Sequence, residues 1–155
     1  MADELAVGAA APDFKLIGSD GKTYTSAQFK GRQAVVIAWF PKAFTGGCTK
    51  ECVSFREGRK ALSHFDVAYF TASCDPAERN KEFAESLRLD YPILSDSDKS
   101  VATAFGCLNS RGVANRWTYY IGKDGTILHI DKSVQPTRHA EAVAAKLKEL
   151  GVAEK

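Results

Sequence analysis

One apolar run, at residues 34–40, most constrains what this chain of 155 residues can fold into. A strand with one face in water alternates apolar and polar residues, but this run contains no charged or hydroxyl side chain. The run therefore predicts a strand that is buried on both faces, as in a parallel or mixed sheet covered by helices. Pro41 ends it, and Gly46 and Gly47 then precede Cys48.

The rest of the chain alternates between strand and helix patterns. Residues 14–17 and 22–25 flank a turn with Asp-Gly and predict an N-terminal hairpin. Further strands are predicted at 65–74, 91–94, 117–121 and 126–130, and helices at 45–64, 76–87, 101–105 and 137–150. Asp75 is expected to cap the second of these helices, with Glu78 three residues after it. This order predicts an α/β three-layer sandwich with a mixed central sheet and an N-terminal β-hairpin.

Length, charge and the N-terminus limit the classes of function. We expect one domain over residues 1–155, because the length suits one core and no repeat or linker interrupts the chain. The net charge of +2 is too small to indicate a nucleic-acid or membrane partner. Residues 1–5 carry two acids and no basic segment, so they resemble no secretory or transit signal, and we expect a cytoplasmic protein. Its four cysteines are then catalytic, metal-binding or simply buried.

Cys48 lies at the predicted start of a helix, where a thiolate is easiest to hold. The helix dipole and the free backbone N–H groups of a first turn both favour a negative sulfur. Gly46 and Gly47 let the backbone approach closely, and the hydroxyl of Thr45 can face the sulfur or cap the helix. From position alone, an inert buried thiol with Thr45 as an ordinary N-cap explains the same residues equally well.

The segment PKAFTGGC at residues 41–48 matches the Pro-x-x-x-Thr-x-x-Cys signature of the peroxiredoxins. The run 39–51 resembles their bacterioferritin-comigratory or Q-type subfamily, and matching segments occur at 11–14, 73–75, 92–96 and 116–119. The resemblance implies a thioredoxin-like fold and a thiol-dependent peroxidase that reduces hydrogen peroxide and organic hydroperoxides. It also implies a monomer without metal or organic cofactor, recycled by thioredoxin or a similar dithiol.

The same resemblance implies roles for five residues. Cys48 would be the peroxidatic thiolate, which attacks one peroxide oxygen and becomes a sulfenic acid. Arg116 would stabilise the thiolate and the charge on the leaving oxygen. Thr45 would hydrogen-bond the peroxide, Pro41 would shield the thiolate from water, and Glu51 would orient Arg116. Without the resemblance, Arg116 is better explained as a solvated residue before a strand, and Glu51 is equally well explained as an acid favoured by the helix dipole.

Cys52 departs from the subfamily pattern, which usually has a resolving cysteine five residues after the first. Here that position is Val53, and Cys52 is four residues from Cys48. Helical residues at that spacing have Cβ atoms ~5–6 Å apart, whereas a disulfide needs roughly 3.5–4.5 Å. A bond between them therefore requires the first helical turn to unwind. Three alternatives remain. Cys52 is then a plain core residue, and the resolving thiol is Cys74 or Cys107, or it comes from another molecule.

Three classes of function remain open on the sequence. The first is the peroxidase. The second is a thioredoxin-like dithiol oxidoreductase, although that class uses Cys-x-x-Cys and three residues separate Cys48 from Cys52. The third is a non-catalytic thiol protein, either a peroxide sensor or a metal-binding module, although the three histidines show no metal-ligand spacing.

Overall fold

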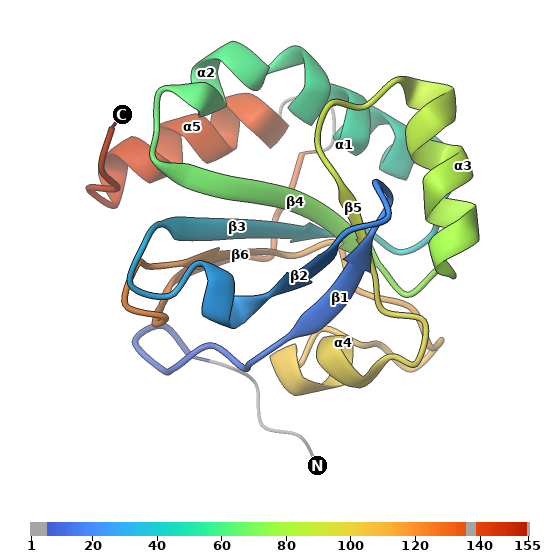
Figure 1. The fold of residues 1–155 in the computed structure, drawn as a ribbon, viewed down its shortest axis with the longest axis horizontal. Helices are drawn as coiled ribbons and strands as arrows, with labels where there is room; N and C mark the ends of the chain where they lie inside the picture. Colours follow the sequence, from blue (N-terminus) through green and yellow to red (C-terminus); the bar gives the residue numbers. More distant parts are fainter. Residues whose placement is uncertain (1–5, 136–138, 155) are drawn as a thin grey trace.

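Within residues 6–135 and 139–154, which the computed structural model describes, seven strands form a mixed sheet in the order β2-β1-β5-β4-β3-β6-β7 (Figure 1). Their bounds are β1 Lys15–Gly18, β2 Thr23–Thr25, β3 Ala34–Trp39, β4 Val67–Ser73, β5 Ile93–Ser95, β6 Thr118–Ile121 and β7 Ile127–Asp131. The central strands β3, β4 and β5 are parallel, while the hairpins β1–β2 and β6–β7 add antiparallel strands at the two edges. The predicted mixed sheet with an N-terminal hairpin is thus confirmed.

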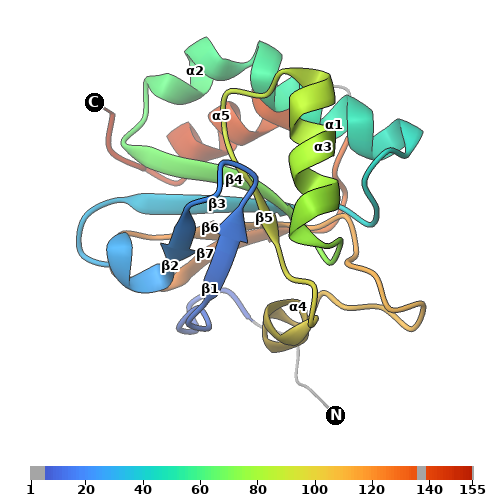
Figure 2. The same ribbon diagram turned by 45° about the vertical axis from the view of Figure 1, so that its right-hand side comes forward.

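Helices cover both faces of this sheet. They are η1 Ser26–Gln28, α1 Gly46–Glu57, α2 Arg59–Ser63, α3 Ala77–Leu87, α4 Ser100–Phe105 and α5 His139–Glu149. Figures 1 and 2 show α1, α2, α3 and α5 on one face and α4 on the other, so the three predicted layers are present. The predicted start of the last helix, at 137, lies outside the described residues. No described helix is both long enough and apolar enough to cross a membrane.

Strand β3 runs through the middle of the sheet and is buried along its whole length, as its apolar run predicts. Its alternate side chains enter different cores: Trp39 meets Phe105 of α4, while Val36 and Ala38 face the layer of α1 and α5. Each large side chain buried in this way contributes about 1.5–3 kcal/mol. The chain turns into α1 after the carboxyl end of this buried strand, so the strand fixes the position of that turn.

The helix predicted over 45–64 is two helices, because the chain bends at Gly58. The reason is tertiary: a side chain at position 58 would overlap the Cβ atom of Ala140, where α5 packs against α1. Backbone contact at this crossing therefore demands glycine, and glycine ends α1.

The prediction that Asp75 caps α3 is wrong. The helix begins at Ala77, with Pro76 as its N-cap residue. The carboxylate of Asp75 instead accepts a hydrogen bond from the backbone N–H of Ala43, at 2.8 Å, across 32 residues of sequence. The side chain thus ties the start of α3 to the loop in front of α1.

Candidate active site

Cys48 lies in the first turn of α1 and exposes only 1% of its surface. Thr45 is the N-cap residue of this helix, and its carbonyl accepts the N–H of Thr49 at 2.9 Å. The N–H groups of a first turn have no acceptor within their own helix, so this end carries partial positive charge. The sulfur of Cys48 therefore lies where the end of the helix attracts negative charge. The sulfur packs in a small core of Phe40, Ala43, Cys52, Phe83 and Ile93.

Arg116 contacts Cys48 although the two residues are remote in sequence. Because β6 runs antiparallel to β3, with Thr118 opposite Ala38, the residues before β6 pass the end of β3 where the turn into α1 begins. The guanidinium Nη2 of Arg116 lies 3.3 Å from Sγ of Cys48, a contact between residues 68 positions apart. The side chain of Arg116 is 22% exposed, so its charge acts at close range with little screening by water.

Glu51 is fully buried one helical turn after Cys48, with Oε2 3.6 Å from Nη1 of Arg116. That distance is too long for a hydrogen bond, and neither carboxylate oxygen has a hydrogen-bond partner among the described residues. Burial raises the pKa of Glu51 to about 8, although Arg116 opposes the rise. The carboxyl therefore tends to keep its proton at neutral pH, which leaves the positive charge of Arg116 available to Cys48.

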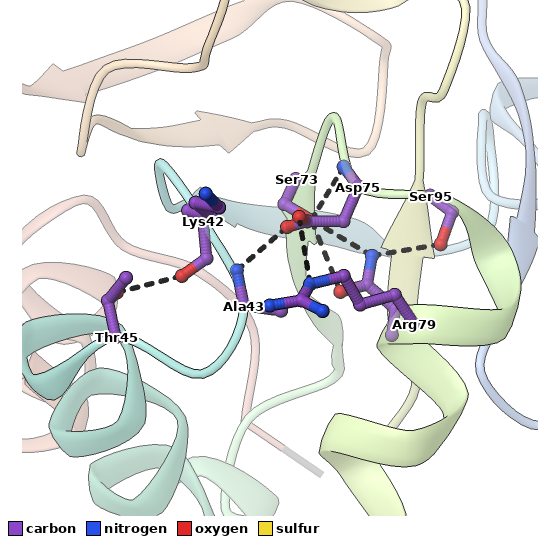
Figure 3. A network of polar contacts seen from close by, with 8 residues as sticks. Lys42, Ala43, Thr45, Ser73, Asp75, Arg79 and Ser95 are labelled. Atoms are coloured by element: carbon purple, nitrogen blue, oxygen red, sulfur yellow. Dashed lines mark hydrogen bonds and ion pairs between the residues drawn. The ribbon is translucent and has the colours of Figure 1, made fainter.

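Thr45 and Pro41 lie at the two ends of the loop between β3 and α1. Thr45 is exposed, and its hydroxyl donates to the carbonyl of Lys42 at 2.8 Å (Figure 3). The alternative that this hydroxyl caps the helix is wrong, since its oxygen accepts no hydrogen bond from the backbone N–H groups of the first turn. Pro41 is partly buried directly after Phe40. The structure thus brings Glu51 and Arg116 to Cys48 at the start of α1, while Pro41 and Thr45 lie in the loop that precedes the helix.

The amino-acid sequence is similar to those of known proteins. Residues 7–130 match the model of the AhpC/TSA family. Over 152 residues the chain is 31% identical to peroxiredoxin Bcp of Escherichia coli K12, an alignment that covers 94% of this chain and 97% of that protein. The chain belongs to the AhpC/TSA family and is a peroxiredoxin.

Solved structures agree with this membership. Peroxidoxin BcpB from Mycobacterium tuberculosis is 30% identical with a TM-score of 0.86, and the match covers 94% of this chain and 98% of that one. The bacterioferritin comigratory protein of Xanthomonas campestris is 26% identical with a TM-score of 0.83, over 94% and 96% of the two chains. The predicted thioredoxin-like fold, the Bcp or Q-type resemblance and the thiol-dependent peroxidase function are confirmed. The first of the three classes of function is the one supported.

The other cysteines of this peroxiredoxin are poor nucleophiles in the folded state. Cys52 is fully buried, with Thr71 Oγ1 3.8 Å from its sulfur, and burial raises its pKa to about 12. Cys74 is half-buried, and burial raises its pKa to about 11. Cys107 is fully buried, which also raises its pKa. None of them can attack a sulfenic acid readily while the fold stays closed.

The sheet separates these cysteines into two groups. Cys52 shares the core of Cys48, on the side of α1 and α3. Cys74 and Cys107 instead pack in the core between the sheet and α4. Cys74 directly follows β4 and packs with Phe70 and Ala72 of that strand, on the face of the sheet opposite to α1. The described residues contain no group of three or more His, Cys, Asp or Glu side chains that could hold a metal.

Gly47 provides the space that Arg116 occupies. A Cβ atom at position 47 would lie 2.9 Å from Nη2 of Arg116, closer than real contacts allow. Neither Gly46 nor Gly47 has a positive φ, so their backbone conformation does not require glycine. The sequence suggests glycine for backbone approach; the structure shows that Gly47 serves the approach of the arginine.

Gly47→Ala is expected to separate activity from stability. Arg116 must move aside, so the rate of Cys48 oxidation by peroxide should fall ~10- to 100-fold, less than the loss from deleting a stabilising donor. The free energy of unfolding should stay the same or rise by up to ~1 kcal/mol, because alanine is the better helix former. Stopped-flow oxidation and thermal unfolding measure the two quantities.

Gly46→Ala is the matched control, since a Cβ atom there would meet nothing within 4 Å in the described part of the chain. It should keep the wild-type rate. An unchanged rate in Gly47→Ala would show that the position of Arg116 does not matter.

Three residues near the site have contacts that local sequence patterns do not indicate. Asp75 is misread as a helix cap because Asp-Pro-x-Glu is the local pattern of one. Phe44 adopts a φ of 65° although it is not glycine, and Arg79 places its guanidinium 5.0 Å from the centre of the Phe44 ring. No local signal indicates either contact, because each depends on how α3 packs beside the loop.

Proposed function

We propose that Cys48 is the peroxidatic cysteine and that Arg116 holds its thiolate. The observation that carries this proposal is the 3.3 Å contact between Arg116 Nη2 and Cys48 Sγ at a buried helix N-terminus. The thiolate attacks one oxygen of the hydroperoxide, and the O–O bond breaks. The electron pair goes to the leaving oxygen, which takes a proton and departs as water or an alcohol, and Cys48 becomes a sulfenic acid.

The substrates proposed are hydrogen peroxide and organic hydroperoxides. In support, the related Xanthomonas campestris protein has alkyl peroxide reduction activity. Thr45 would turn its hydroxyl from Lys42 to the bound peroxide, and Pro41 would keep water from the sulfur. Glu51 would orient Arg116 through the contact at 3.6 Å while staying largely protonated.

Cys52 is the proposed resolving thiol. Its thiol condenses with the sulfenic acid of Cys48, which forms a disulfide and releases water. The shared core of Cys48 and Cys52 supports this choice, since Cys74 and Cys107 belong to the other core. Thioredoxin or a similar dithiol would then reduce the bond. Residues 1–155 would form one domain, and the protein would act as a cytoplasmic monomer.

One equivalent of hydrogen peroxide should convert the reduced protein to a Cys48–Cys52 disulfide, which peptide mapping by mass spectrometry detects. In Cys52→Ser the first oxidation should keep its rate, and sulfenic and then sulfinic acid should accumulate at Cys48. Cys74→Ser is the control and should still form the bond. A wild-type disulfide to Cys74 or Cys107, or a lasting sulfenic acid, would contradict the assignment of Cys52.

A further inference from the structure

The loop at residues 41–45 is attached to the start of α3 by a buried polar contact. The N–H of Ala43 donates to Oδ2 of Asp75 at 2.8 Å, and Nε of Arg79 lies 3.8 Å from Oδ1 of the same carboxylate (Figure 3). Ala43 is 1% exposed and Asp75 only 9% exposed, so water competes little for either group. Loss of the carboxylate would leave a buried N–H without an acceptor.

Phe44 adds a second attachment between the same two segments. Its ring centre lies 5.0 Å from that of Phe83 in α3, and the guanidinium carbon of Arg79 lies 5.0 Å from the centre of the Phe44 ring. A positive φ is unfavourable for a phenylalanine, and it persists only where surrounding contacts hold it. Arg79 therefore serves both attachments, one through Asp75 and one through the ring.

These contacts lie directly in front of the helical turn that must open for resolution. Cys52 is fully buried and four residues from Cys48 in one helix, so no disulfide forms while that turn is intact. Unwinding the turn moves the preceding loop, because the chain is continuous from 41 to 48. The strained φ of Phe44 favours release of the loop, whereas the contacts of Asp75 and Arg79 oppose it.

We propose that Asp75 and Arg79 form a latch that holds loop 41–45 against α3 and so decides how often Cys52 becomes accessible to Cys48. This inference rests on the proposed role of Cys52 as resolving thiol. Asp75 and Arg79 are positioning residues, since they act through the loop and do not touch the sulfur of Cys48. A closed latch preserves the site that reacts with peroxide. An open latch lets the Cys52 thiol condense with the sulfenic acid, with loss of water, before a second peroxide oxidises it to sulfinic acid.

Alkylation of Cys52 without peroxide tests the latch directly. The background is Cys48→Ser, which removes the reactive thiol, and iodoacetamide labelling is followed by peptide mass spectrometry. Arg79→Gln and Asp75→Asn should raise the labelling rate of Cys52 about fivefold or more, the scale of losing one charge-assisted contact from a local opening. Lys81→Gln removes a charge from an exposed position of the same helix and should leave the rate unchanged.

Cys107, fully buried in the other core, reports on unfolding of the whole protein. A higher labelling rate at Cys52, with the labelling rate of Cys107 unchanged, supports the latch. An unchanged labelling rate at Cys52, or an equal increase at both cysteines, overturns the latch. If Asp75→Asn does not fold, Arg79→Gln decides, because its side chain is 43% exposed and tolerates replacement.

Peroxide treatment separates this inference from the proposed function. With Cys48 intact, Arg79→Gln should accumulate less sulfinic acid than wild type under excess hydrogen peroxide, because resolution is faster. Equal or greater sulfinic acid in Arg79→Gln would overturn the latch. If Cys48→Ser were to lose no peroxidase activity, the proposed function would fail, while the labelling of Cys52 would still decide whether the latch exists.

Discussion

Cys48→Ser is expected to abolish peroxide reduction, with a fall in turnover on the order of 10³-fold or more, as when a catalytic nucleophile is removed. A serine hydroxyl stays protonated at neutral pH, so neither the helix N-terminus nor Arg116 can make it a comparable nucleophile. Consumption of hydrogen peroxide and of an organic hydroperoxide, with dithiothreitol as reductant, measures the effect. Wild-type turnover in the variant would remove Cys48 from the mechanism.

The control for this variant must show that the fold is intact. The side chain at 48 is 1% exposed in an apolar core, so a serine hydroxyl there costs about 1–3 kcal/mol if it finds no partner. Circular dichroism and thermal unfolding should show a folded protein that is less stable. Cys74→Ser changes a cysteine in the other core and should keep the turnover.

Arg116→Met should have the second-largest effect, a loss on the order of 10²-fold in the rate of Cys48 oxidation. Methionine fills part of the space but has no positive charge and no N–H donors for the thiolate or the leaving oxygen. Alkylation of Cys48 by iodoacetamide at neutral pH should slow by about tenfold, because the thiolate loses its charged partner at 3.3 Å. Stopped-flow oxidation and timed alkylation give the two rates.

Arg111→Met is the matched control, since Arg111 is exposed in the loop that leads to Arg116. It should change neither rate. Glu51 keeps the stability cost of Arg116→Met small: its pKa of about 8 already leaves the carboxyl largely neutral at pH 7. Loss of Arg116 then leaves no full negative charge buried without a partner at Glu51. Unaltered oxidation and alkylation in Arg116→Met would show that the guanidinium is not part of the site.

Local sequence patterns predict the fold well where short-range physics decides. The apolar run of β3 predicts burial on both faces, because no polar side chain could face water. The patterns fail at Gly58 and Asp75. Gly58 ends α1 because Ala140 packs against it, and Asp75 bonds to Ala43 although it stands in a capping pattern. Each outcome depends on a partner that is remote in sequence.

Some features of the site also follow from local sequence, while others depend on tertiary structure. The signature at 41–48 marks Cys48 and places it at a helix start, and both follow from the order of neighbouring residues. Arg116 beside Cys48, the room that Gly47 leaves, and the two cores that separate Cys52 from Cys74 are decided by tertiary structure. Strand and helix preferences depend on residues a few positions away. Contacts across 68 residues, and the burial of a thiol, depend on how strands align and on which face of the sheet each side chain enters.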